Sequence, residues 1–227
     1  MTFTHLSHDR DNALREDIIA TAMKMNRAGI NQGKSGNVSA RTESGFLITP
    51  TGIPYEDAKR EHIVPMMLDG MHTGNVLPSS EWRFHRDIYA SRPDVEAIVH
   101  THAVHCTALA VHGRGIPPFH YMVAIAGGAD IRCAPYATFG TQELSDHAVA
   151  ALKDRKACLL AHHGTIAVGR DLAQALAIAV EVETLAKTYL AALAVGEPPL
   201  LSDAEMARVL EKFATYGQQP DAGLKTV

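Results

Sequence analysis

The spacing of hydrophobic residues along the chain predicts several amphipathic helices. Apolar residues between Leu14 and Met25 recur at three- and four-residue steps, the spacing that places side chains on one face of a helix. This helix is expected to cover residues 12–28 and to end at Gly29. Similar patterns predict helices that run from Ser79 or Ser80 to Arg92 and over residues 103–112, 141–152, 171–195 and 203–213.

Shorter apolar runs predict β-strands, because branched and apolar residues dominate them. They cover residues 46–49, 63–68, 97–102, 131–134 and 157–163, and Gly45 separates the first from a preceding short strand. Pro65 interrupts the second run. Since proline cannot donate to a sheet, that strand is expected at an edge or with a bulge. Tyr121 is expected to be a half-buried aromatic residue of a strand that leads into residues 123–126.

Two of the apolar runs end in histidines. If residues 97–102 form a strand, His100 and His102 share one face, with Cβ atoms roughly 6 to 7 Å apart. Histidines at strand ends also occur as packed residues that bond to the backbone. The run that ends in His162, His163 and Gly164 repeats the pattern, and a third imidazole from a neighbouring strand would complete a three-histidine metal site with an open position.

Small polar residues and glycines gather in three segments that could bind an anion. In residues 31–39 the glycines let backbone N–H groups converge, and Lys34, Ser35 and Asn37 add side-chain donors. A plain turn explains the same composition. Thr51 and Gly52 could belong to the same cradle. The third segment contains Ser79, Ser80 and Glu81 at a helix start, where the serines either cap the helix or bind a phosphate. The glutamate either complements the helix dipole or faces the metal.

Composition restricts the range of partners. The 227 residues, of 24.5 kDa, contain 46% hydrophobic and 20% charged residues and carry a net charge of −4. These values predict one globular domain over residues 1–227, with flexible ends at 1–11 and 218–227, and give no reason to expect a nucleic acid or a membrane partner. The amino terminus has no apolar signal core, so a cytoplasmic location is expected. Three cysteines outside CxxC pairs are expected to be reduced core residues.

Six segments in order resemble the class II aldolase/adducin family: NQGKSGNVSAR, LITPTGIPY, LPSSEWRFH, VHTHAVHCTAL, CAPYATFGT and HHGTIAVG. The resemblance extends from about Arg15 to Gly217. It implies an α/β fold, a three-layer α/β/α sandwich around a mixed, mostly antiparallel sheet. It also implies a homotetramer with active sites between subunits.

The resemblance implies a role for individual residues. Zinc, or another divalent metal such as Mn²⁺ or Co²⁺, would be held by His100, His102, His163 and Glu81, and Glu81 would also serve as the acid or base. Tyr121 would donate a proton from the adjacent subunit, while Phe139 and Tyr216 would border the aldehyde pocket. The residues of the phosphate site would be Gly36, Asn37, Thr51, Gly52, Ser79 and Ser80.

The activity that the resemblance implies is reversible cleavage of a ketose 1-phosphate to dihydroxyacetone phosphate and an aldehyde. L-fuculose 1-phosphate, 5-deoxyribulose 1-phosphate and 5-methylthioribulose 1-phosphate all contain the required half. Zinc is an electron sink for this chemistry, and a carboxylate can move the proton. The alternatives within the family are a pentulose-phosphate 4-epimerase, a decarboxylase of an oxo-acid phosphate and a non-catalytic scaffold like adducin.

Overall fold

The computed structural model describes residues 3–214, and the side chains from Asp11 onward. In chain order, the elements are α1 (Phe3–Arg27), β1 (Asn37–Thr42), β2 (Gly45–Ile48), the 3₁₀ turn η1 (Arg60–His62), β3 (Val64–Met67), α2 (Trp82–Ser91), β4 (Ala97–Thr101), α3 (Val104–Ala110), the 3₁₀ segment η2 (Tyr121–Ala126), β5 (Arg132–Ala134), α4 (Gln142–Ala151), β6 (Ala157–Leu160), β7 (Gly164–Gly169), α5 (Leu172–Val195) and α6 (Asp203–Phe213).

The strands form one seven-stranded sheet in the order β3-β2-β1-β4-β7-β6-β5. Every neighbouring pair is antiparallel except β5 and β6, which are parallel. The predicted mixed, mostly antiparallel sheet is confirmed. β3 lies at an edge, as Pro65 requires, because proline lacks the N–H that a strand inside the sheet would donate.

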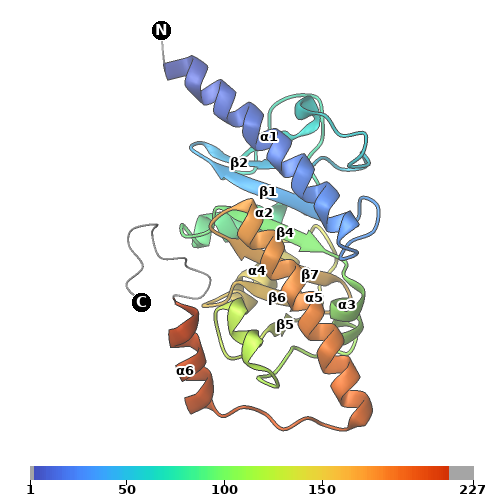
Figure 1. Ribbon diagram of the computed structural model, residues 1–227. Coiled ribbons are helices and arrows are strands. Elements are labelled where there is room, and N and C mark those ends of the chain that lie inside the picture. Colours follow the sequence, from blue (N-terminus) through green and yellow to red (C-terminus); the bar gives the residue numbers. More distant parts are fainter. Residues whose placement is uncertain (1–2, 215–227) are drawn as a thin grey trace.

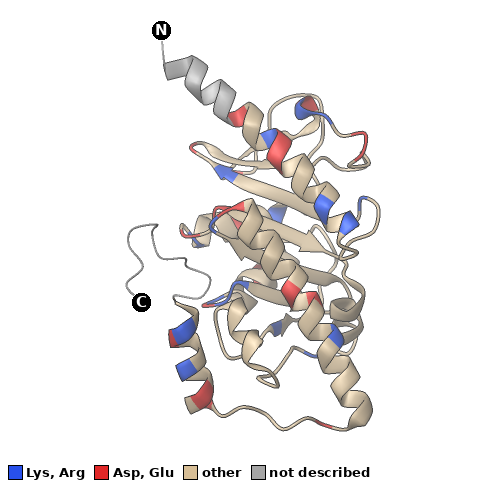
Figure 2. Ribbon diagram, viewed as in Figure 1, with Lys and Arg blue, Asp and Glu red and all other residues tan. Residues whose placement is uncertain are grey.

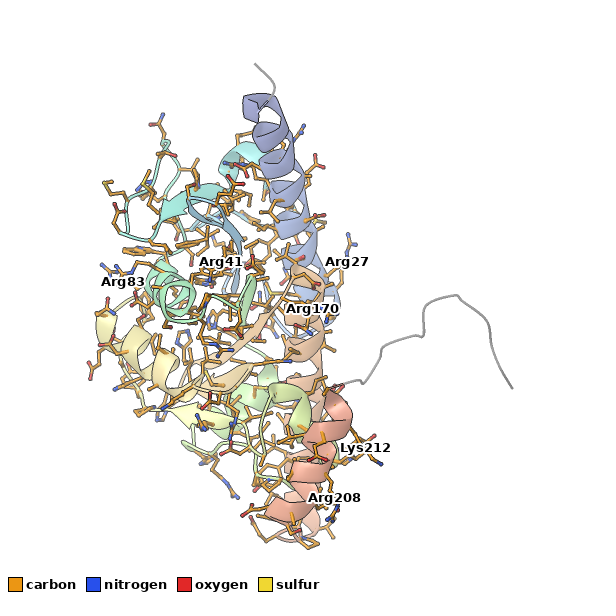
Figure 3. The ribbon with its side chains drawn as sticks, turned by 90° about the vertical axis from the view of Figure 1, so that its left-hand side faces the viewer. Arg27, Arg41, Arg83, Arg170, Arg208 and Lys212 are labelled. Atoms are coloured by element: carbon orange, nitrogen blue, oxygen red, sulfur yellow. The ribbon has the colours of Figure 1, made fainter. Side chains whose placement is uncertain are left out.

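Helices cover both faces of the sheet. In Figure 1, α1 and α5 cross the front of the sheet, and the side view in Figure 3 places α2 and α4 on the opposite side. One buried core joins α1, α3 and α5 to the sheet through residues such as Val38, Val99 and Val182. A second core joins α2 and α4 to the other face through Ile98 and Ile166. These are the three layers expected of an α/β/α sandwich.

Several elements differ from the prediction. α1 begins at Phe3 rather than at residue 12, so residues 3–11 are helical. The predicted flexible end at 218–227 lies outside the described residues. Tyr121 opens a 3₁₀ segment instead of lying in a strand, and its backbone turn is supported by the His120 ring, which accepts a hydrogen bond from the Met122 N–H. The strand β7 had not been predicted.

Charged residues are spread over the molecule. Figure 2 shows both signs on α1 and on α6, whereas most of α5 carries neither. In the described part of the chain, no helix is both long and apolar enough to cross a membrane. The three cysteines are free thiols.

Candidate metal centre and substrate site

Three separate parts of the chain bring four potential metal ligands together. His100 lies in the central strand β4, and His102 follows just after its end. His163 lies in the tight turn between β6 and β7, where the preceding His162 adopts a left-handed conformation with φ of 55°. Glu81 is the residue before α2 and is 5% exposed. All four side chains therefore converge where β4 ends beside α2.

The distances between these four side chains match those expected between ligands of one metal ion. The nearest oxygen–nitrogen pairs are Glu81 Oε2 to His100 Nε2 at 3.2 Å and Glu81 Oε1 to His163 Nε2 at 3.0 Å. The Nε2 atoms of His100 and His102 are 3.1 Å apart, and one ligand atom from each residue lies within 4.8 Å of the others. A tetrahedral zinc site with bonds near 2.1 Å has edges of about 3.4 Å.

The hydrogen bonds around the cluster leave acceptor atoms directed at its centre. His100 Nδ1 lies 3.0 Å from the Thr165 carbonyl oxygen, which can only accept, so Nδ1 carries the proton and Nε2 presents a lone pair. Glu81 Oε1 is buried, and among the described residues the polar side-chain atom beside it is His163 Nε2 at 3.0 Å. Unpaired buried acceptors are costly unless a cation satisfies them. The donor set fits a divalent metal ion.

The electrostatics of the cluster favour an ionised Glu81 and a neutral His102. Burial alone would raise the pKa of the Glu81 carboxyl, but His100 and His163 outweigh it and hold this pKa well below its usual range. Burial and the neighbouring histidines lower the pKa of His102 to about 4. Carboxylate and neutral imidazole are the forms that bind metals.

Backbone contacts position the histidines. Asn31, which is buried, accepts a hydrogen bond from the His102 N–H at 3.3 Å through its side-chain oxygen. Gly36 lies so close to β4 that an added Cβ would be 2.4 Å from the His100 carbonyl oxygen. Neither Asn31 nor the packing role of Gly36 was predicted, because both depend on contacts between segments distant in sequence.

The three segments predicted to form an anion cradle lie together at this site. Lys34 Nζ donates to the Gly52 carbonyl at 2.8 Å, and the Thr51 N–H donates to the Leu77 carbonyl at 3.1 Å. Ser79 is buried and its hydroxyl oxygen accepts from the Glu81 N–H at 3.3 Å, whereas Ser80 is exposed.

The predicted cap of α2 is corrected. Neither Ser79 nor Ser80 is the N-cap, a position that Glu81 occupies without a side-chain capping bond. The physical reason is that the Ser79 hydroxyl bonds to Glu81 N–H, and the Ser79 carbonyl accepts from Trp82 N–H. This turn places the glutamate side chain in the cluster.

The Asn37 side chain is hydrogen-bonded to the Glu81 carboxylate. It is 2% exposed and its Nδ2 donates to Glu81 Oε2 at 2.9 Å. Its Oδ1 lies 2.5 Å from Nε2 of His85, a fully buried histidine that had not been predicted as a site residue. The signal in the sequence was the spacing of Glu81 and His85, four residues apart on one helix face.

The three predicted aromatic residues differ in position. The Phe139 side chain is 65% exposed. Its loop is held near Ser80, because the Arg83 guanidinium donates to the Gly140 carbonyl at 2.7 Å. Figure 3 labels Arg83 on α2. Tyr121 is 50% exposed and lies in η2, which packs against α5 and α6 on the opposite face from α2. Within one chain it is not brought to the cluster. Tyr216 lies outside the described residues.

Fold and site define the class of the protein. The chain belongs to the family described as class II aldolase and adducin N-terminal domain, whose model matches residues 16–190. It is 58% identical over 207 residues to the L-fuculose phosphate aldolase of Escherichia coli, covering 91% of this chain and 96% of the relative.

Two further relatives agree with this assignment. A 5-methylthioribulose-1-phosphate/5-deoxyribulose-1-phosphate aldolase of Rhodospirillum rubrum is 56% identical over 205 residues, covering 90% of this chain and 93% of the relative. A solved structure of an L-fuculose 1-phosphate aldolase superposes with a TM-score of 0.87 at 40% identity, covering 89% of this chain and 96% of the other.

Proposed function

We propose that this protein is a metal-dependent class II aldolase, a lyase that cleaves a ketose 1-phosphate to dihydroxyacetone phosphate and an aldehyde. The observation that carries the proposal is the cluster of three histidines and one buried glutamate beside three small-residue segments. Relatives named as L-fuculose phosphate aldolase and as 5-methylthioribulose-1-phosphate/5-deoxyribulose-1-phosphate aldolase support it.

The metal ligands in this proposal are His100, His102, His163 and Glu81, and the metal is zinc, with Mn²⁺ or Co²⁺ as alternatives. When bound, the ion supplies a Lewis acid that stabilises the negative charge of the breaking carbon–carbon bond. Glu81 is the acid or base: its Oε1, which lies beside His163 Nε2 and is not bound by Asn37, is the atom that exchanges a proton with the substrate. Asn37 holds the other carboxylate oxygen through the hydrogen bond that its side-chain amide donates at 2.9 Å.

The phosphate of the substrate binds to the three converging segments. Backbone N–H groups of glycines and hydroxyl groups suit a phosphate, which then supplies binding energy and orients the reacting bond. Asn37 retains one amide hydrogen after its bond to Glu81, and this hydrogen is available for substrate. The residues proposed for this site are Gly36, Asn37, Thr51, Gly52, Ser79 and Ser80.

The aldehyde half of the substrate is a short sugar with an apolar or deoxy C5 end. L-fuculose 1-phosphate, 5-deoxyribulose 1-phosphate and 5-methylthioribulose 1-phosphate are the proposed substrates. Phe139 and Tyr216 border this half of the pocket. The exposure of Phe139 fits a residue that becomes covered when substrate or another subunit is present.

The proposed assembly is a homotetramer with each site between two subunits. Tyr121 is then the proton donor from the adjacent subunit, consistent with its half-exposed position on the face away from Glu81 of its own chain. A cytoplasmic location is also proposed, where the three free cysteines remain reduced.

The decisive experiment is a retro-aldol assay on the purified, zinc-loaded protein. Release of dihydroxyacetone phosphate from each of the three ketose 1-phosphates is coupled to its NADH-dependent reduction. We expect turnover of at least one substrate, and loss of turnover after chelation or in His102→Ala. Absence of product from all three with zinc bound would overturn the aldolase proposal, and separate assays with a pentulose phosphate and with an oxo-acid phosphate would test the alternative epimerase and decarboxylase activities.

A further inference from the structure

Two rows of polar side chains interlock between β1 and α2. Asn37 and Ser39 lie two residues apart and therefore point to the same face of β1. The opposite face of the strand carries apolar core residues. Glu81, His85 and Tyr89 follow one another at four-residue steps and therefore share one face of α2. The row runs from the candidate metal centre into the core between the sheet and α2.

Consecutive members of the two rows are hydrogen-bonded. Asn37 Nδ2 donates to Glu81 Oε2 at 2.9 Å, and Asn37 Oδ1 lies 2.5 Å from His85 Nε2. His85 Nδ1 lies 2.7 Å from the Ser39 hydroxyl, which lies 2.8 Å from the Tyr89 hydroxyl. His85 and Ser39 are 0% exposed and Tyr89 is 1% exposed, so water does not replace any of these partners.

The chemistry of the groups sets the direction of every bond. A carboxylate oxygen only accepts, so the Asn37 amide turns its N–H toward Glu81 and its oxygen toward His85. An amide oxygen also only accepts, so His85 Nε2 carries the proton. In neutral His85 the Nδ1 atom is then an acceptor for the Ser39 hydroxyl, and Ser39 accepts from Tyr89.

Neutral His85 agrees with its surroundings. Burial lowers the pKa of His85 to about 3, and the nearby His100 adds to this shift, although Glu81 opposes it. A doubly protonated ring would reverse the bond to Ser39 and leave one hydroxyl hydrogen, that of Ser39 or of Tyr89, without a described acceptor. The row consequently has one consistent set of donors, which starts at Tyr89 and ends at Glu81.

We infer that His85 is a positioning residue that acts through Asn37: its Nε2–H holds the Asn37 amide in the one orientation that donates to Glu81. This inference rests on the proposed role of Glu81 as metal ligand and as acid or base. The ring nitrogens of His85 bond to Asn37 and Ser39, neither of which is a candidate metal ligand. Its effect is to keep Glu81 Oε2 occupied, so that Oε1 alone remains for the metal and the proton.

Without the Nε2–H donor, the buried Asn37 oxygen loses its hydrogen-bond partner. The amide is then no longer held in the orientation that donates to Glu81. Loss of a hydrogen bond that orients a metal ligand from outside typically lowers metal affinity or activity by about 10- to 100-fold. We therefore expect His85→Leu to weaken zinc binding and to lower kcat within this range; KM is also measured, because Asn37 belongs to the proposed phosphate site.

The test compares His85→Leu, His85→Gln and a matched control. The side-chain amide introduced by His85→Gln retains an N–H and an oxygen that can serve Asn37 and Ser39, so this variant should recover most of the lost zinc affinity. The control is His147→Leu on α4, the same exchange at a histidine whose buried Nδ1 has no hydrogen-bond partner in the described chain. Zinc affinity is measured by competition with a chromophoric chelator, and kcat and KM by the coupled assay.

A double-mutant cycle shows whether His85 acts through Asn37. In the Asn37→Ala background, His85→Leu should cause little further loss of zinc affinity, since the amide that it orients is absent. Losses that multiply in the double variant, an unchanged affinity in His85→Leu, or an equal loss in His147→Leu would each overturn the inference.

A spectroscopic measurement separates this inference from the proposed activity. Long-range ¹H–¹⁵N correlation on ¹⁵N-histidine protein, with the His85→Gln spectrum for assignment, should show the Nε2–H form of neutral His85. An Nδ1–H form would overturn the inference even if the enzyme is an active aldolase. The Nε2–H form together with the expected zinc affinities would support it even if none of the three ketose 1-phosphates is cleaved.

Discussion

At the scale of single residues, two glycines let neighbouring strands approach the end of β4. A Cβ on Gly36 would lie 2.4 Å from the His100 carbonyl oxygen, and one on Gly164 would lie 2.3 Å from the Thr101 carbonyl oxygen. The strand that carries the first histidine is therefore enclosed on both sides by residues without side chains. This close approach brings Asn37 of β1 opposite His100.

Substitution of Gly36 should damage both stability and the metal site. Gly36→Ala forces β1 away from β4 and is expected to lower the free energy of unfolding by about 1 to 3 kcal/mol. Because Asn37 moves with the strand, zinc affinity should fall by about tenfold or more. Urea unfolding and chelator competition measure the two effects.

Gly33→Ala is the control for this prediction. Gly33 has a φ of +59° and open space around its missing Cβ. Alanine there costs about 1 to 2 kcal/mol for the left-handed conformation, but zinc affinity should be unchanged. Equal zinc affinity in Gly36→Ala and the wild-type protein would contradict the role assigned to the close approach.

The sequence allowed the four residues of the cluster to be anticipated, but not the residues that support them. His100, His102 and His163 stand at the ends of apolar runs, a local signal, and Glu81 stands at a helix start. His85 and Ser39 are also polar residues in otherwise apolar surroundings, yet their partners lie 46 and more positions away along the chain. A local pattern contains no information on such pairings until the sheet and α2 are placed together.

At the scale of elements, helix starts were predicted well where a side chain caps them. Thr141, Asp171 and Ser202 each accept a hydrogen bond from a backbone N–H three residues later. Strand β7 was not predicted, because its short apolar run begins and ends with glycine, at Gly164 and Gly169, and glycines also indicate turns. Its strand conformation depends on pairing with β4 and β6 on both sides.

The cap of α5 gives a prediction at this scale. Asp171 Oδ1 accepts from the Gln174 N–H at 2.7 Å, so Asp171→Ala should cost about 1 kcal/mol and lower Tm by about 2 to 4 °C. Asp171→Asn retains an acceptor for the same N–H and should melt close to the wild type. Equal melting of the alanine and asparagine variants in differential scanning calorimetry would argue against capping as the cause.

At the scale of the whole molecule, Tyr121 lies away from the candidate metal centre of its own chain. The tyrosine lies with η2 against α5 and α6, and Glu81 lies at the start of α2 on the other face of the sheet. The proposed tetramer resolves this separation by supplying the tyrosine from a neighbour. Each complete site would then need two chains.

Mixed tetramers test this arrangement. Glu81→Gln and Tyr121→Phe should each lose most turnover in the retro-aldol assay. When the two variants are co-expressed and purified as mixed assemblies, activity should return to about a quarter of the wild-type value, since one of four neighbour pairings joins an intact Glu81 to an intact Tyr121. Mixed assemblies as inactive as their parents would contradict a site shared between subunits.

The number of residues that can pair between the polar rows of β1 and α2 is limited by the different rise of a strand and a helix. Two residues along a strand advance about 6.7 Å, whereas four residues along a helix advance about 6.0 Å. Each step therefore displaces one row from the other by about 0.7 Å, so hydrogen-bonding partners drift out of reach after a few members. At the far end, Arg41, which Figure 3 labels, places its guanidinium 4.8 Å from the Tyr89 ring centre. It donates to the Tyr89 backbone carbonyl instead of to its hydroxyl. The mismatch of the two repeats limits how deeply a polar network can penetrate this core.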